Sequence, residues 1–299
     1  VSVDALLLLQ QTLNGLQLGV MLFLLAAGLT LVFGIMDLIN LAHGSFYMVG
    51  AYLTAWVAGA TGSFLLGLLL AVPLTALLGL AVERVALSGL YRRDHLYQVL
   101  ATFGLILFFN DAIRLLFGPL PIFLDPPAAL GGQIELLGAP YPAYRLAIIA
   151  MGLGVALFLW WLVTRTRVGM WVRAGASNRE MLMALGVDVR LLFTLVFALA
   201  AGLAALAGAM AGPILAVRVG MGEDILILTF VVIVVGGVGS IQGAFLGALL
   251  IGFVDTFGRA FLPGLLGDTA GASLASTGIY LVMALVLALR PRGLLPAAA

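Results

Sequence analysis

The sequence predicts an all-α integral membrane protein with about eight to nine transmembrane or re-entrant helices and two Gly-rich membrane breaks. Hydrophobic residues make up 64% of the chain and charged residues 9%, and the mean hydropathy is +1.23. Soluble domains carry about 25% charged residues, so a soluble fold is excluded. Apolar runs long enough to cross about 30 Å of hydrocarbon recur from end to end. We expect one polytopic domain over residues 1–299.

Missing residue types exclude several kinds of chemistry. All 14 basic residues are Arg, whereas a phosphate-binding P-loop and Schiff-base catalysis both need Lys. The chain has no Cys and two His, His43 and His95, so neither a thiol nucleophile nor a Cys- or His-based metal site is expected. No HExxH or GxSxG motif occurs. We therefore expect no enzyme, no cofactor and no metal site.

Nine apolar stretches are candidate membrane-spanning helices, and two of them are short. The first is expected to be a retained span, because the 15 residues before it contain no Arg or Lys to form the basic region of a signal peptide. The nine stretches are 16–35, 46–62, 64–82, 96–117, 144–163, 191–212, 225–241, 243–262 and 274–289.

Arg residues gather in 83–95, in 164–190 and after residue 289, whereas 118–143 contains none. Cytoplasmic loops of membrane proteins collect Arg and Lys. If all nine stretches cross, the Arg-rich segments and the C-terminus lie in the cytosol and the N-terminus lies outside. With that topology Arg218 and Arg259 lie on the outer side of the membrane, and they are the two exceptions to the rule.

The cytosolic loop 164–190 contains a predicted surface helix. Ser177 and Glu180 form a Ser-x-x-Glu capping box, which predicts a helix from Asn178, and Gly186 is suited to end it in a left-handed conformation. A helix of two turns is unstable alone. We expect a partner protein to pack on it, the alternative being lipid headgroups or the chain itself. Its apolar face consists of Met181, Leu182, Ala184 and Leu185.

Two Gly-rich segments, 34–50 and 236–247, interrupt the apolar sequence and resemble each other. His43-Gly44-Ser45-Phe46 aligns with Gln242-Gly243-Ala244-Phe245. Irregular backbone inside a bilayer is tolerated only where protein buries it or where it lines a cavity. Paired broken segments in the two halves of a chain are typical of a transport pathway. The alternative is that both are ordinary cytosolic loops between hairpin spans.

Ionisable residues inside apolar sequence form three groups. Asp37, Asn40 and His43 recur at i, i+3 and i+6, so a continued helix would place them near one side, as a proton relay or as caps at a span end. Asp111–Arg114 and Asp255–Arg259 have the spacing of local ion pairs. Close helix packing is expected at the small-residue ladders Gly15/Gly19, Gly208/Gly212 and Gly239/Gly243/Gly247.

Three runs of sequence resemble the permease subunits of bacterial branched-chain amino acid ABC importers, the LivH-like group. They are 28–53 with INLAHG, 166–188, and 234–252 with GGVGSIQGAFLG. The resemblance covers nearly the whole chain in order and spacing. It implies a multi-pass subunit of the bacterial inner membrane. The implied partners are a second, LivM-like permease, two cytosolic ATPases and a periplasmic solute-binding protein, and no nucleic-acid partner is expected.

The resemblance also implies roles for residues. Ser45 departs from the family pattern, since Glu follows His-Gly in its branched-chain amino acid member; branched-chain amino acids, amides, urea and aromatic acids all stay open as substrates. The alternative function is a self-sufficient secondary transporter or channel with ion sites at Asp37, Asp111 or Asp255. The family's ATPase-coupling segment falls on Ser177, Arg179, Glu180, Met181, Leu182, Ala184, Leu185 and Gly186. Its translocation-pathway motifs fall on Asn40, His43 and Gly44, and on Gly237, Gly239, Ser240 and Gly243.

Overall fold

The computed structural model describes residues 2–91 and 93–296, most of which are helical. Each of the nine apolar stretches coincides with a long helix, because an apolar run in a membrane protein satisfies its backbone polar groups within the helix. The long helices are α1 (Ser2–Met36), α2 (His43–Thr61), α3 (Phe64–Val82), α4 (His95–Phe117), α5 (Ala143–Arg165), α8 (Val189–Ala211), α9 (Met221–Gly236), α10 (Ile241–Leu266) and α11 (Asp268–Leu289).

Seven helices in the described part of the chain are long and apolar enough to cross a membrane. Two of the nine long helices, α2 and α9, are not among them. The protein is therefore an all-α membrane protein with about seven candidate transmembrane helices, whereas the expected eight to nine counted transmembrane and re-entrant helices together. The seven are Ala5–Met36, Phe64–Leu90, His95–Phe117, Ala143–Arg165, Val189–Ala211, Ile241–Leu266 and Asp268–Leu289.

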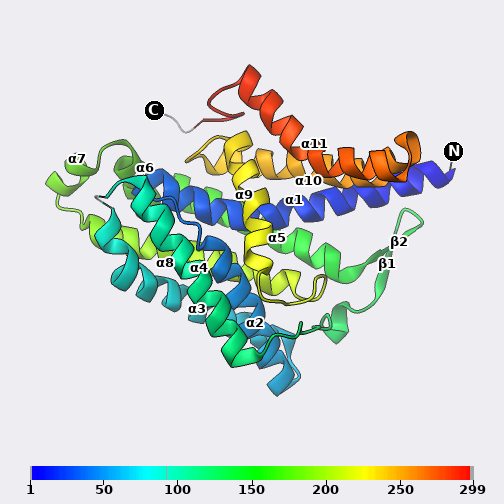
Figure 1. Ribbon diagram of the computed structural model, residues 1–299, viewed down its shortest axis with the longest axis horizontal. Coiled ribbons are helices and arrows are strands. Elements are labelled where there is room, and N and C mark those ends of the chain that lie inside the picture. The colour runs from blue at the N-terminus through cyan, green and yellow to red at the C-terminus, as the bar shows by residue number, and fades with distance from the viewer. Residues whose placement is uncertain (1, 92, 297–299) are drawn as a thin grey trace.

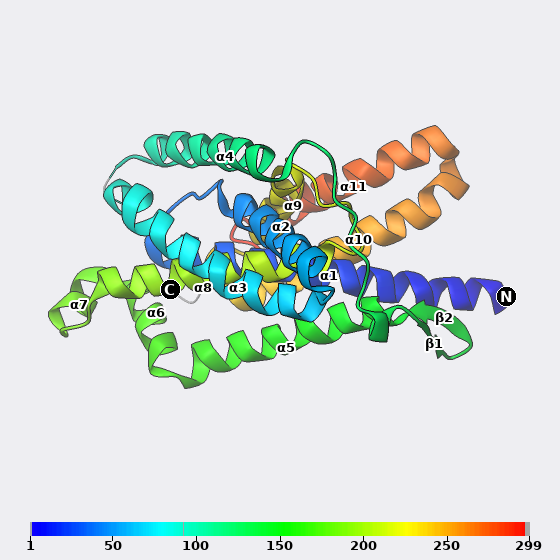
Figure 2. The ribbon, with the colours of Figure 1, turned by 90° about the horizontal axis from the view of Figure 1, so that it is seen from below.

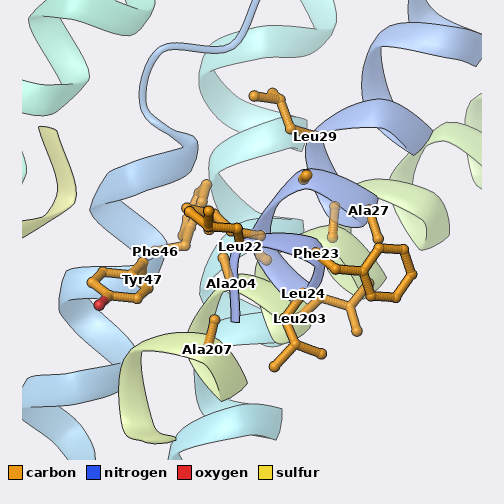
Figure 3. Close-up of a cluster of buried hydrophobic side chains, with 14 of the residues drawn as sticks. Leu22, Phe23, Leu24, Ala27, Leu29, Phe46, Tyr47, Leu203, Ala204 and Ala207 are labelled. Atoms are coloured by element: carbon orange, nitrogen blue, oxygen red, sulfur yellow. The ribbon is translucent and has the colours of Figure 1, made fainter. Parts of the chain in front are cut away.

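The core is built around α1 and α8, which are the most buried of these candidate spans. In the most apolar part of each helix, 83% of the residues of α1 and 72% of those of α8 are buried, whereas in α11 the share is 11%. Small residues on α8 permit close approach: a Cβ on Gly208 would lie 1.9 Å from the Tyr47 carbonyl oxygen of α2. Figure 3 shows side chains of α1, α2 and α8 meeting in this core, among them Phe23, Phe46 and Leu203.

The Gly15/Gly19 ladder, predicted to mediate close packing, does so between α1 and α10. A Cβ on Gly15 would meet the Phe253 ring at 2.6 Å, and one on Gly19 would meet the Leu249 Cα at 3.0 Å. The outer helices instead leave large apolar side chains uncovered, such as Leu100 on α4 at 67% exposed. Apolar surface on that scale is typical of contact with lipid.

A short antiparallel hairpin, β1 (Gln133–Leu136) and β2 (Ala139–Pro142), is the one sheet in the described chain and was not expected. Leu137 and Gly138 connect its strands with φ of 52° and 84°, as the two-residue turns of tight hairpins require. Hydrogen bonds from the side chains of Tyr141 (3.1 Å) and Arg145 (2.7 Å) to Asn14 Oδ1 fix the hairpin and α5 to α1.

The molecule has two distinct ends along its long axis. The hairpin lies beside the N-terminal part of α1 at one end, and α6 (Arg167–Ser177) and α7 (Arg179–Ala184) lie at the other in both views (Figures 1 and 2). A π turn (Glu83–Leu87) and a 3₁₀ turn (Ser88–Leu90) extend α3, and they reach the same end as α7, because the Tyr91 ring contacts the Phe193 ring of α8. The Arg-rich segments therefore cluster at one end of the fold.

Candidate functional site

The first candidate site is the segment 37–42 between α1 and α2, which we name the first break. The helix ends at Met36, and Asp37 adopts a φ of 53°, a left-handed conformation in which a non-Gly residue does not continue a helix. Asp37, Asn40 and His43 therefore do not lie along one continued helix. Asp37 is exposed, whereas Asn40 and His43 are buried.

Side chains hold the first break in place. Gln98 of α4 accepts a hydrogen bond from the Ile39 backbone N–H at 3.2 Å, and its own amide group donates to the Leu90 and Arg93 carbonyls. His43 Nε2 lies 3.1 Å from the Leu25 carbonyl oxygen of α1. A carbonyl accepts only, so this nitrogen carries the proton.

Asn40 is the exceptional residue of the first break. It is 0% exposed, yet neither its amide nitrogen nor its amide oxygen has a hydrogen-bond partner among the described residues. Leaving a buried polar group unpaired costs about 1–3 kcal/mol, and Asn40 has two such atoms. The sequence placed Asn40 at this site but gave no sign that its amide would be unpaired.

The second candidate site is the segment 237–240 between α9 and α10, which we name the second break. Gly237 and Gly239 have φ of 113° and 80°, which residues with a Cβ rarely adopt. Ser240 Oγ caps α10 by accepting a hydrogen bond from the Gly243 N–H at 3.0 Å. The predicted motif residues therefore form the end of one helix and the start of the next.

The C-terminal segment 290–296, which we name the tail, completes the second break. The Leu294 N–H donates to the Val235 carbonyl and the Leu295 N–H to the Gly236 carbonyl, both at 2.9 Å. These are two of the carbonyls that the end of a helix leaves without an intrahelical partner. A Cβ on Gly243 would lie 2.3 Å from the Gly236 oxygen, so glycine is required there. Sequence analysis did not find this role of the tail.

The two breaks lie next to each other. A Cβ on Gly34, near the end of α1, would lie 3.1 Å from the Gly239 Cα of the second break. At the start of α2, Gly44 is so close to Gly222 of α9 that a Cβ would lie 2.3 Å from the Gly222 oxygen. Glycine at these positions lets backbone meet backbone, so the end of α1 packs on the second break and the start of α2 packs on the start of α9, at the other end of that helix from the second break.

The predicted surface helix exists, but its start differs from the expectation. Ser177 is the last residue of α6, and Asn178 caps α7 by accepting a hydrogen bond from the Met181 N–H at 2.9 Å. The Ser177–Glu180 capping box is therefore wrong. Gly186 has a φ of 82°, as predicted for the residue that ends the helix.

The apolar face of α7 is divided between the protein and solvent. Leu182 is 3% exposed, and its side chain lies 3.3 Å from where a Cβ on Gly175 would be. Three apolar side chains remain uncovered, and Ala184 beside them is also exposed. They are Met181 (59% exposed), Met183 (54%) and Leu185 (73%).

Both predicted ion pairs are present. Arg114 Nη1 lies 3.7 Å from Asp111 Oδ1, and Arg259 Nε lies 2.9 Å from Asp255 Oδ2. Asn110, beside the first pair, donates from its amide to Glu223 at the start of α9. Each of the two carboxylates, Asp111 in α4 and Asp255 in α10, thus has an Arg partner on its own helix that offsets its charge.

Comparison with known proteins identifies the family to which this chain belongs. The family model described as branched-chain amino acid transport system / permease component matches residues 11–289. The chain belongs to this permease family. No solved structure matches it.

The permease has relatives along its whole length. It is 31% identical to the high-affinity branched-chain amino acid transport system permease protein BraD of Pseudomonas aeruginosa, over 96% of this chain and 95% of the relative. It is 29% identical to the corresponding protein LivH of Escherichia coli K12 and of Salmonella typhimurium, with the same coverage. The chain is thus a multi-pass ABC transport permease of a non-catalytic family, and membership implies ATPase, permease and binding-protein partners.

Proposed function

We propose that this permease, a single domain over residues 1–299, forms half of a translocation pathway for branched-chain amino acids or a related small solute. Its partners are a second, LivM-like permease subunit, two cytosolic ATPases and a periplasmic solute-binding protein. The likeness to amino acid permeases over the whole chain supports the substrate class. Ser45, which departs from the family pattern, marks the position at which we expect the substrate choice to differ.

In this proposal the two breaks lie at membrane depth and line the pathway. The observation that carries it is Asn40, since a buried amide with both polar atoms unpaired is unfavourable for folding alone. Its retention is explained if the amide acquires partners, from substrate or water, when the pathway opens. Alternating access needs such an element with two arrangements.

The proposed orientation places the α7 end in the cytosol and the hairpin end outside. The Arg-rich segments at the α7 end support it, because cytoplasmic loops collect Arg. In this orientation α2 and α9, which are not among the seven candidate spans, are the re-entrant helices. Helices α1 and α2 flank the first break in the chain as α9 and α10 flank the second, which is the order expected of a repeated unit.

The proposed ATPase contact is the exposed part of the coupling segment. Met181 on the six-residue helix α7 and Leu185 directly after it are uncovered, and short helices need tertiary packing. Leu182 instead packs on Gly175 of α6, so it anchors α7 to the permease rather than contacting the ATPase. Arg179 and Glu180 flank this surface at the start of α7.

The pathway proposal is tested with Asn40→Leu in the complex reconstituted with its partners. Leucine has the same branching as asparagine and no unpaired polar atom, but it is larger, so the gain from removing the unpaired amide offsets the cost of tighter packing and the complex should assemble with a melting temperature close to the wild-type value. Uptake of radiolabelled leucine should fall about tenfold or more, the equivalent of about 1.4 kcal/mol.

The matched control is Thr30→Val in α1. Thr30 Oγ1 is also fully buried without a partner, and valine removes its hydroxyl at nearly constant volume. This variant should transport at the wild-type rate. Wild-type uptake by the Asn40→Leu complex would contradict the pathway role.

The coupling surface is tested with Leu185→Asp. If an ATPase groove covers this side chain, a buried unpaired carboxylate there is strongly unfavourable. The variant should insert in the membrane normally but lose co-purification with the ATPases and lose uptake. Leu137→Asp, on an 88% exposed side chain at the opposite end, is the control and should keep the ATPases bound. Normal co-purification of both variants would mean that α7 contacts lipid.

A further inference from the structure

A buried carboxylate, that of Glu83, lies at the end of α3 and has no part in the two breaks. Its side chain is 2% exposed, and it begins the π turn Glu83–Leu87. Single π turns within helices frequently occur at functional sites. A carboxylate removed from water needs donors around it, so its partners indicate what it connects.

Glu83 joins two segments of the chain through hydroxyl groups. Tyr91 Oη donates a hydrogen bond to Glu83 Oε1, and Thr194 Oγ1 of α8 donates to Oε2 at 2.8 Å. Arg84 Nε lies 3.9 Å from Oε2 and donates to Thr194 Oγ1 at 3.0 Å. Because the Arg84 side chain is 56% exposed, the two hydroxyls provide the buried part of this network.

The network continues from Tyr91 to α7. The Tyr91 ring meets the Phe193 ring edge-on with centroids 5.4 Å apart. On α7, the Arg179 guanidinium carbon lies 5.5 Å from the centroid of the same Phe193 ring, a cation–π distance. Burial and the hydrogen bond to Glu83 raise the pKa of Tyr91, so the phenol keeps the proton that it donates.

We propose that Glu83 is a positioning residue that transmits displacement of α7 to α3 and α8. The inference rests on the proposed function, in which α7 contacts an ATPase. Energetic coupling travels through packed side chains and hydrogen-bond networks that have two discrete arrangements. Hydroxyl donors suit this role because rotation about one bond redirects them: Thr194 Oγ1 also lies 3.0 Å from the Arg190 carbonyl, an alternative acceptor on α8.

The test removes one hydroxyl. Tyr91→Phe keeps the ring against Phe193 but breaks the bond to Glu83, and Tyr97→Phe, on a 57% exposed ring, is the matched control. Both are assembled with the partner subunits in proteoliposomes. We expect Tyr91→Phe to keep basal ATP hydrolysis and the wild-type assembled fraction. Stimulation of hydrolysis by the solute-loaded binding protein should fall about fivefold or more, the lower end of typical coupling between sites. Tyr97→Phe should match the wild type.

A graded variant sharpens the test. Glu83→Gln retains an acceptor oxygen for one of the two hydroxyls, so its loss of stimulation should be intermediate. Wild-type stimulation in Tyr91→Phe would overturn the inference. If Tyr91→Phe lowered the assembled fraction, the uptake and the hydrolysis by one common factor, the role of the network would be merely structural. That outcome would overturn the inference about Glu83 but not the proposed function. A wild-type complex with neither uptake nor stimulation would overturn both.

Discussion

The two breaks interrupt the chain in similar ways but are held by different groups. Side chains hold the first break, through Gln98 and His43. Backbone groups hold the second, through the tail N–H groups of Leu294 and Leu295. Among the described residues, the first break contains a buried side chain with unpaired polar atoms, Asn40, and the second contains none.

This difference indicates a division of work. A side-chain amide or imidazole exchanges partners by rotating, whereas a backbone bond between two segments breaks only when the segments separate. Glycine contacts such as Gly243 on Gly236 leave no room for repacking, and closely packed regions do not deform gradually. We infer that the first break rearranges during transport and that the second is the fixed surface against which it moves.

The largest effect should follow from filling the second break. Gly243→Leu places a side chain against the Gly236 and Leu295 oxygens, at 2.3 and 2.7 Å for its Cβ alone. Overpacking of this kind should cost about 3 kcal/mol or more, measured as loss of folded protein in detergent. Gly264→Leu, where no atom lies within 4 Å of an added Cβ, should fold normally on the same helix. Equal yields would mean that the second break is not rigid.

An intermediate effect is expected at the first break. Gln98→Met preserves the length of the side chain but leaves the Ile39 N–H without its acceptor. The cost should be about 2 kcal/mol, and uptake should fall further than the loss of folded protein explains, because the break loses its position. Gln10→Met, which removes one 3.4 Å bond to the Pro140 carbonyl, serves as control. Uptake that simply follows the folded fraction would place Gln98 outside the moving part.

The smallest effect is expected in the tail. Leu294→Pro removes the N–H that donates to the Val235 carbonyl, and Leu294→Ala removes the side chain but keeps that N–H. The difference between the two melting curves should correspond to about 1 kcal/mol, with uptake per folded complex unchanged. A selective loss of uptake in Leu294→Pro would show that the second break moves as well.

The helices of the membrane domain could be predicted from sequence because their signal is local. Long apolar runs predicted all nine long helices, and the i, i+3 and i, i+4 spacings of Asp111–Arg114 and Asp255–Arg259 predicted both ion pairs. Gly186 ended α7 as expected because a left-handed residue after a short helix is itself a local feature. The sequence did not separate spans from re-entrant helices, because apolar content does not distinguish a short helix inside the protein from one that crosses.

The site was only partly predictable because its partners are distant in sequence. Nothing near Asn40 in the chain shows that Gln98 would hold the neighbouring backbone. The capping box at Ser177 failed because the preceding residues continue α6, so Asn178 was left as the first free residue. The N-cap of α7 was thus decided by where α6 ends, and the four-residue motif Ser177–Glu180 carries no information about α6.

The role of the tail has a consequence for the order in which the protein folds. The N–H groups of Leu294 and Leu295 complete the end of α9, yet they follow α10 and α11 in the chain. During synthesis, α9 and α10 must enter the membrane before those donors have been made. The carbonyls of Val235 and Gly236 therefore have no tail donors until α10, α11 and the tail have been synthesised, so the second break reaches its native form only after both of those helices have been made.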